Sequence, residues 1–228
     1  KAWFEHAMLR LKDHEPIQHI TGREEFYGMK FRVSKHVLIP RPETEELVEW
    51  IVADFEKEDR KLRILDIGTG SGCIAISLGK ALQNSEVTAF DISDEALQLA
   101  KTNAEENKVA VNFEKMDILV SETLAGKFDI IVSNPPYVRE LEKEDMHKNV
   151  LNHEPEKALY VKDENPLIFY KKIAGLATDS LEPGGCLYFE INQYLAEETK
   201  ELVESFGFDT GLKKDIFGNF RMLKAVKK

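Results

Sequence analysis

Hydrophobic and polar positions follow two different periods along this chain. Apolar residues recur at helical spacing over residues 2–12 and 44–55, which predicts amphipathic helices there. Between them, in residues 17–37, two glycines separate short apolar runs, a pattern typical of a β-hairpin. From residue 62 onward, runs of consecutive apolar residues alternate with helical patterns. We therefore expect strands that are buried on both faces, with helices between them.

This alternation predicts a doubly wound α/β domain with a mostly parallel sheet, because strands that are joined by helices pair in parallel. The expected strands are residues 62–67, 86–90, 109–113, 128–133 and 186–191, followed by an antiparallel hairpin of 210–213 and 221–226. The expected helices are residues 73–82, 94–107, 166–181 and 195–206. Residues 139–162 show weak periodicity and are interpreted as a long loop. The sheet would then have seven strands.

Composition and charge narrow the class of protein. The chain has 228 residues, of which 43% are hydrophobic, enough for one well-buried core. Its net charge of −10 disfavours a protein that binds duplex DNA. Cys73 and Cys186 lie far apart without metal-binding spacing, so we expect no metal site, no disulfide and a reducing cytoplasm. No uncharged stretch is long enough to cross a membrane.

A glycine-rich loop stands between the first strand of the expected sheet and its helix. Residues 68–72 read Gly-Thr-Gly-Ser-Gly, so backbone amides at a helix N-terminus can meet a ligand without Cβ atoms in the way. The dinucleotide fingerprint needs a third glycine at position 73, where this chain has Cys73, and Asp66 lies inside the strand just before the loop. Both features weaken the assignment of NAD as the ligand. The alternative is that the loop is only a structural turn.

Carboxylates at the ends of the next two strands favour the ligand. Asp91 follows the loop by about 20 residues, the distance at which a carboxylate accepts from both hydroxyls of a ribose. Asp117 ends the third strand and could accept from the amino group of adenine, with Ile118 against the ring. The loop lacks a phosphate-binding lysine. An adenosine ligand that carries positive charge, such as S-adenosylmethionine, fits this acidic set best.

The fourth strand ends in the turn Asn134-Pro135-Pro136-Tyr137. The prolines make this turn rigid and extended at the ligand-binding edge of the sheet. The Asn134 side-chain oxygen and the Pro135 carbonyl could accept the two hydrogens of a planar amino group, and the ring face of Tyr137 could lie against the reacting nitrogen or the sulfonium. The alternative is a proline turn in which Asn134 only caps the strand end.

With these motifs the chain resembles the release-factor glutamine methyltransferases, a family of class I S-adenosylmethionine-dependent enzymes. The segments that carry the resemblance are EPIQHITG (15–22), LIPRPETE (38–45), DIGTGSG (66–72), NPPY (134–137), and EP at 154–155 with AL at 158–159. The resemblance implies a Rossmann-like class I methyltransferase fold over residues 38–228. Residues 1–37 would be the remainder of an N-terminal helical domain and a linking hairpin. The activity implied is methylation of the side-chain amide of the glutamine in the Gly-Gly-Gln motif of peptide chain release factors, with S-adenosylhomocysteine as the second product.

The resemblance also implies roles for individual residues. The cofactor would contact Asp66, Gly68, Thr69, Gly70, Ser71, Gly72, Asp91, Asp117, Ile118 and Asn134. The substrate glutamine would be held by Asn134, Pro135, Pro136 and Tyr137, of which Asn134, Pro135 and Tyr137 would serve catalysis. Arg41 would either grip the substrate protein or make a local ion pair with Glu43 or Glu45. Glu190 is expected to be a structural acceptor, and Asn192, where the family usually has glycine, is expected to change the backbone locally without loss of chemistry.

Two other functions stay open at this point. An adenine-N6 DNA methyltransferase can use the same turn, because an adenine amino group is also planar and conjugated. The negative net charge, the absence of a basic recognition domain and the Pro-Arg-Pro-Glu-Thr-Glu segment disfavour it. A non-catalytic cofactor-binding protein on the same fold is the second alternative, which Asn134 and Asp91 disfavour. We expect a cytoplasmic monomer whose partners are release factors, with no contact to DNA or membranes.

Overall fold

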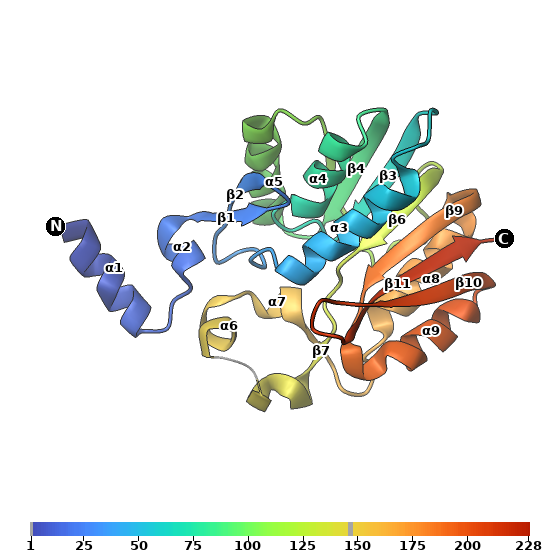
Figure 1. Cartoon of the computed structure of the whole chain (residues 1–228). Helices are drawn as coiled ribbons and strands as arrows, with labels where there is room; N and C mark the ends of the chain where they lie inside the picture. The colour runs from blue at the N-terminus through green and yellow to red at the C-terminus, as the bar shows by residue number, and fades with distance from the viewer. Residues whose placement is uncertain (1, 146–147) are drawn as a thin grey trace.

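Seven strands form one sheet in the order β10-β11-β9-β6-β3-β4-β5 (Figure 1). The computed structural model describes residues 2–145 and 148–228. The strands are β3 (Leu62–Ile67), β4 (Ser85–Asp91), β5 (Asn112–Lys115), β6 (Phe128–Ser133), β9 (Leu181–Glu190), β10 (Phe208–Lys214) and β11 (Phe220–Lys227). The first five pair in parallel, whereas β11 lies antiparallel between β9 and β10. The predicted fold class, with its antiparallel hairpin at the end, is confirmed.

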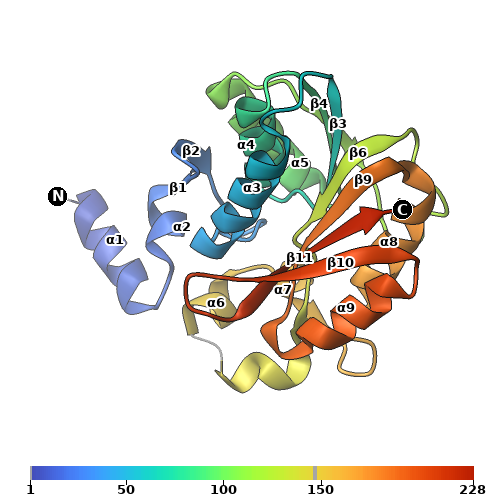
Figure 2. The same cartoon turned by 45° about the vertical axis from the view of Figure 1, so that its right-hand side comes forward.

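Helices cover both faces of this sheet (Figures 1 and 2). The helices that pack on it are α3 (Pro42–Phe55), α4 (Cys73–Ala81), α5 (Asp94–Asn107), α8 (Ile168–Ser180) and α9 (Ala196–Glu204), the last preceded by the short turn η2 (Gln193–Leu195). Successive strand residues enter opposite cores. Ile64 packs in the cluster with α3 and α4, while Leu65 packs in the cluster with α8 and α9, and both are fully buried. This double burial explains the consecutive apolar residues in the strands.

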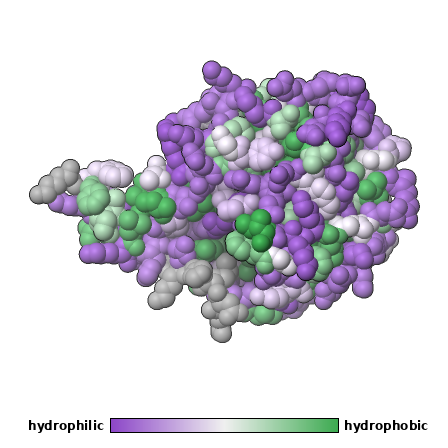
Figure 3. All heavy atoms as spheres, viewed as in Figure 1, coloured by the Kyte–Doolittle hydropathy of each residue, from purple (hydrophilic) through white to green (hydrophobic). Residues whose placement is uncertain are grey.

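The N-terminal segment contains α1 (Ala2–Lys12), α2 (Ile17–Thr21), β1 (Arg23–Phe26) and β2 (Met29–Arg32). Helix α1 stands away from the sheet in both views, and hydrophobic side chains gather over it in Figure 3. The expected hairpin is present, with a two-residue turn of positive φ at Tyr27 and Gly28. Its Phe26 and Phe31 belong to the same core cluster as α3. The hairpin therefore packs on the sheet domain, and a domain boundary at residue 38 stays a prediction.

Three local expectations were wrong. The segment from residue 17 was expected to be hairpin throughout, but α2 precedes it, because five residues are too few to show helical periodicity. Strand β5 starts at Asn112 and not at residue 109, since Lys108 caps α5 with φ 57° and the Val109 amide still bonds to Ala104 at 3.0 Å. Strand β9 starts at Leu181 and not at residue 186, and its pairing with β6 is irregular between Phe128 and Ile130.

The segment expected as a loop over residues 139–162 contains short elements. They are β7 (Val138–Arg139), η1 (Glu140–Asp145), α6 (Lys148–His153), α7 (Glu156–Leu159) and β8 (Tyr160–Val161), and β7 pairs with β8 in parallel. Residues 146 and 147 of this segment lie outside the described residues. In the described ranges, no helix has the length and hydrophobicity that crossing a bilayer requires.

Candidate active site

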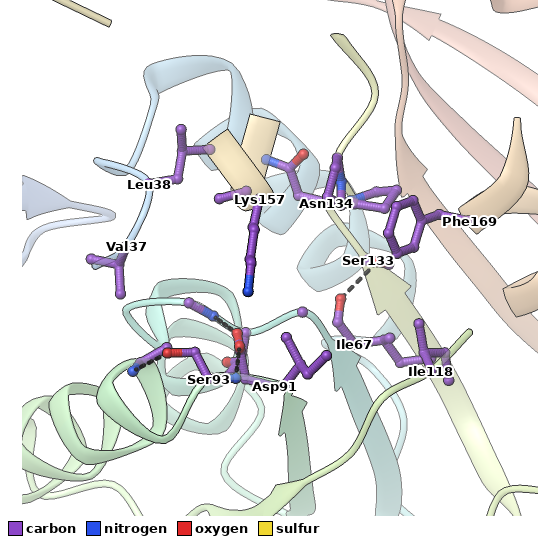
Figure 4. A pocket seen from close by; sticks show the side chains of 18 of the residues that line it. Val37, Leu38, Ile67, Asp91, Ser93, Ile118, Ser133, Asn134, Lys157 and Phe169 are labelled. Carbon is purple, nitrogen blue, oxygen red and sulfur yellow. Dashed lines mark hydrogen bonds between the residues drawn. The ribbon is translucent and has the colours of Figure 1, made fainter. Parts of the chain in front are cut away.

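A cavity of about 1110 Å³ opens at the carboxyl ends of β3, β4 and β6 (Figure 4). Three segments that follow these strands line it: residues 67–71, 90–96 and 133–136. Residues of α7, α8 and the segment before α3 complete the wall. The volume slightly exceeds the range of about 300–1,000 Å³ that is common for small-ligand sites. The cavity can therefore accept a ligand of nucleoside size with room for a substrate side chain.

The glycine loop presents bare backbone to this cavity. Gly68 and Gly70 line it with φ of +78° and +55°, and a Cβ at either position would meet no protein atom within 4 Å. That open space is where a ligand would approach the backbone. Gly72, also at positive φ, has another role, because a Cβ there would lie 3.0 Å from Ile76 Cδ1 and 3.1 Å from Ala100 Cβ. It permits close packing of α4 on α5 and is not part of the cavity wall.

Asp91 lies at the end of β4 and organises the loop opposite (Figure 4). Its Oδ2 accepts the Gly70 amide at 2.8 Å and its Oδ1 accepts the Ser93 amide at 2.9 Å. Each carboxylate oxygen keeps a second lone pair, which is the capacity that a ribose diol requires. Asp117 and Ile118 also line the cavity, and Asp117 Oδ1 accepts the Leu119 amide at 3.0 Å. The structure thus brings these three predicted residues to one wall.

Asp66 lies within β3 and outside the cavity wall. Its side chain is fully buried, Oδ2 accepts the Thr69 hydroxyl at 2.7 Å, and Oδ1 has no partner. Burial raises the pKa of the Asp66 carboxyl to about 7. Thr69 and Ser71 both line the cavity, and Ser71 has a buried hydroxyl without a partner. The unpaired hydroxyl of Ser71, on the cavity wall, is available to a polar ligand.

The Asn-Pro-Pro-Tyr turn leaves the sheet beside the glycine loop. The Ser133 hydroxyl, at the end of β6, donates to the Ile67 carbonyl at 2.7 Å and so ties the two strand ends together. Asn134, Pro135 and Pro136 line the cavity. Tyr137 does not belong to the wall, and its hydroxyl donates to Glu190 Oε1 at 2.9 Å. The structure thus places Asn134 and Pro135 with the loop, and turns the Tyr137 hydroxyl toward the core.

Arg41 forms an ion pair with a partner that the sequence analysis did not name. Its guanidinium contacts the buried carboxylate of Glu154, and the Ile39 amide donates to the same carboxylate at 3.3 Å. A local pair with Glu43 or Glu45 was the wrong expectation. Arg41 also lines the cavity. The pair joins the segment before α3 to the Glu-Pro segment before α7, two stretches that carry the family resemblance.

Asn192 has an ordinary extended backbone, with φ −67° and ψ 124°, so this position does not require glycine. Its Oδ1 accepts the Tyr194 amide at 2.9 Å. Its Nδ2 donates to the Tyr137 carbonyl at 3.0 Å and to the Glu142 carboxylate at 3.0 Å. The asparagine thus caps η2 and connects the Asn-Pro-Pro-Tyr turn to η1.

Several residues of the cavity were missed by the sequence analysis. Thr44, in the first turn of α3, and Phe169 and Ile173, on α8, line the wall. Lys157 of α7 extends its side chain into the cavity (Figure 4). Phe169 and Ile173 follow a helical stripe that indicates only a core face. No sequence signal distinguishes Lys157 from the other lysines of the chain.

Known proteins are similar to this chain in sequence and in fold. The family model described as "Methyltransferase small domain" matches residues 45–164. A protein of Flavobacterium psychrophilum, named release factor glutamine methyltransferase, is 56% identical over 97% of this chain and 79% of its own length. The structure of a release-factor-specific protein-(glutamine-N5) methyltransferase from Alicyclobacillus acidocaldarius matches with a TM-score of 0.53 at 27% identity, covering 87% of this chain and 99% of that one. A Thermus thermophilus rRNA methyltransferase in complex with AdoMet and guanosine has the same fold, with a TM-score of 0.64 at 21% identity, over 90% of this chain and 50% of that one.

Proposed function

Since this chain belongs to the release factor glutamine methyltransferase family, we propose that the cavity beside Asn134 is where it methylates the glutamine side chain of a release factor. The observation that carries this proposal is the meeting of the glycine loop, Asp91 and the Asn-Pro-Pro-Tyr turn in one cavity. The enzyme uses S-adenosylmethionine, which supplies an electrophilic methyl group on a sulfonium. The task of the protein is therefore to hold an amide nitrogen in line with that group.

The residues of the wall fit the two halves of this cofactor. Gly68 and Gly70 offer backbone without Cβ atoms where the methionine part would lie, and Asp91 offers free lone pairs for the ribose hydroxyls. Asp117 and Ile118 would border the adenine, with polar and apolar contact respectively. We assign Gly72 and Asp66 to support of the loop from behind, because neither belongs to the cavity wall.

The glutamine amide would be held from the other side. The Asn134 side-chain oxygen and the Pro135 carbonyl would accept its two hydrogens, beyond the end of the β6 ladder at Ser133. Both acceptors stabilise the positive charge that grows on the nitrogen as its lone pair attacks. Pro136 keeps the turn extended. The nitrogen that has gained the methyl group would lose its extra proton to water after the transfer, so no general base is required. Tyr137 would support the turn through Glu190.

The protein substrate follows from the family and the charge. We propose the glutamine of the Gly-Gly-Gln motif as the acceptor, because the net charge of −10 opposes a nucleic acid substrate. Arg41 would act indirectly, by holding the wall through Glu154. We further propose that the enzyme works in the cytoplasm as a monomer, with residues 1–37 belonging to the part that contacts the release factor.

A methyl-transfer assay with labelled S-adenosylmethionine tests the proposed function. The three substrates are a release factor with an intact Gly-Gly-Gln, the same factor with that glutamine replaced by alanine, and unmethylated DNA. We expect label on the intact factor only. Label on the alanine variant would place the modification at another residue, and label on DNA would move the assignment to an adenine methyltransferase.

Cofactor affinity should increase with pH around neutrality. The pKa of Asp66 is raised to about 7 in the free protein, and the ammonium and sulfonium of the cofactor would favour its ionised form. Binding at pH 6 must therefore release a proton that binding above pH 7 does not. We expect the dissociation constant to be about fivefold larger at pH 6 than at pH 7 by proton linkage. Isothermal titration calorimetry measures both values, at pH values where the cofactor's amino group stays charged.

The Asp66→Asn variant is the control for this dependence. Asparagine keeps the shape of the side chain but has no proton to release, so the affinity of the variant should not change between pH 6 and pH 7. A dependence that persists in Asp66→Asn would contradict the assignment of the released proton to Asp66.

A further inference from the structure

Three hydrogen bonds connect Asn134 to the core behind it. The Asn134 amide nitrogen lies 3.3 Å from the Thr44 hydroxyl. That hydroxyl donates to Glu190 Oε2 at 2.6 Å, and the Tyr137 hydroxyl donates to Glu190 Oε1 at 2.9 Å. Thr44 and Glu190 are 3% and 2% exposed, so water does not compete for these bonds. Thr44 lies in α3, Asn134 follows the end of β6, and Glu190 is the last residue of β9.

Chemistry fixes the direction of each bond. An ionised carboxylate can only accept, so Glu190 takes the single proton of the Thr44 hydroxyl. Burial and the nearby Glu190 charge raise the pKa of Tyr137 well above its usual range, so the phenol keeps its proton and donates it to Glu190. Burial raises the pKa of Glu190, while the hydrogen bonds from Thr44 and Tyr137 and the charge of Arg221 oppose this shift, and we take Glu190 as the ionised acceptor of both hydroxyls. The Thr44 oxygen is then left with lone pairs alone.

This direction decides how the Asn134 amide is turned. An oxygen with no proton to give can only face the NH₂ half of an asparagine amide. The carbonyl half of Asn134 is therefore left free of Thr44 and can serve as the acceptor for an incoming amino group. The opposite rotamer would set an NH₂ group against the substrate's own NH₂ and a carbonyl oxygen against the Thr44 oxygen.

We propose that Thr44 is a positioning residue that, with Glu190 as its proton acceptor, holds the Asn134 amide with its oxygen toward the substrate nitrogen. The inference rests on the proposed function, since it concerns the acceptor that would bind the glutamine. Thr44 acts only through Asn134 and takes no part in the transfer itself. Its hydroxyl, and not its methyl group, carries the effect.

Substitutions that separate hydroxyl from methyl test the proposal. Thr44→Val keeps the shape of the side chain and removes the hydroxyl, whereas Thr44→Ser keeps the hydroxyl and removes the methyl group. We expect kcat to fall roughly tenfold in Thr44→Val, which corresponds to the loss of one hydrogen bond. The dissociation constant for S-adenosylmethionine should not change. Thr44→Ser should recover most of this loss. A packing role predicts the reverse order, with valine active and serine impaired, and would overturn the proposal.

Two further measurements complete the design. Thr199→Val is the matched control, because Thr199 is fully buried but its hydroxyl donates to the carbonyl of Leu195, the N-cap of its own helix α9. Its kcat should equal that of the wild type. The double variant Thr44→Val with Asn134→Ala should be no slower than Asn134→Ala alone, since Thr44 acts through Asn134. A further loss in the double variant would overturn the proposal, because it would show an effect that does not pass through Asn134.

Failure of this inference is distinguishable from failure of the proposed function. If the wild type does not label the glutamine, the proposed function is wrong whatever Thr44 does. If Asn134→Ala keeps full kcat, the assignment of Asn134 as the acceptor is wrong, and the role of Thr44 falls with it. If both tests succeed and Thr44→Val has the kcat of the wild type, only the role of Thr44 is wrong. If thermal unfolding shows that Thr44→Val is unstable, the kcat values of Thr44→Ser and Thr44→Ala test the proposal instead. The proposal predicts that Thr44→Ser is active and that Thr44→Ala is impaired.

Discussion

Replacing Asn134 with alanine should lower kcat by about 10² to 10³, the usual cost of removing one group that stabilises charge in a transition state. The Asn134 oxygen would accept a hydrogen bond from the substrate nitrogen. Because positive charge develops on that nitrogen during attack, this hydrogen bond is strongest in the transition state. Initial rates of methyl transfer to a release factor, at saturating concentrations of both substrates, measure this loss. The dissociation constant for S-adenosylmethionine should change little, because Asp91 and the glycine loop hold the cofactor.

The control for this variant is Asn84→Ala. Asn84 is exposed at the opposite end of the sheet, and its amide donates to the Asp59 carbonyl, so its removal should leave kcat unaffected. An Asn134→Ala enzyme with a kcat within twofold of the wild type would contradict the assignment of Asn134 as the acceptor of the glutamine amide.

Replacing Asp91 with alanine should weaken S-adenosylmethionine binding by at least about 100-fold. The carboxylate accepts the Gly70 and Ser93 amides and would also accept the ribose hydroxyls. Hydrogen bonds to a charged group contribute about 1.5–3 kcal/mol each, so loss of two exceeds the 2.7 kcal/mol or so that corresponds to this factor. Isothermal titration calorimetry of the purified variant gives the affinity directly.

Glu86→Ala is the matched control, because it removes another carboxylate from the same strand. Glu86 pairs with Lys61 on the surface and does not line the cavity. Its removal should leave cofactor affinity within twofold of the wild type. If Asp91→Ala bound the cofactor as tightly as Glu86→Ala does, the ribose contact assigned to Asp91 would be wrong.

The sheet could be predicted from the sequence because its strands are buried on both faces. Runs such as residues 62–67 and 128–133 are mostly apolar, and the structure shows successive residues entering opposite cores. Where the signal was local and short, prediction failed. Helix α2 has only five residues, too few for a helical period to be visible. The start of β5 depends on the left-handed conformation of Lys108 at the end of α5, which the sequence does not indicate.

The same distinction applies to the cavity. Gly68, Gly70, Asp91 and Asn134 follow strand ends, and parallel strands bring their carboxyl ends to one edge, so their convergence was predictable. The bond from Thr44 to Glu190 joins positions 146 residues apart, and the pair of Arg41 with Glu154 joins positions 113 apart. Contacts at such separations depend on how α3 and α7 pack, which no periodicity encodes. The motif PRPETE was recognisable as a whole, but the role of its threonine required the structure.

Cys73 begins α4 directly after the glycine loop, and this place has a consequence for reactivity. A thiol at a helix N-terminus is commonly acidified and becomes a good nucleophile. Here Cys73 is buried against the loop, and burial raises its pKa to about 12. The side chain therefore stays a thiol at physiological pH and is a poor nucleophile, although it lines the cavity. A cysteine beside the cofactor site is thereby poorly suited to act as an oxidative switch, because oxidation follows thiolate character.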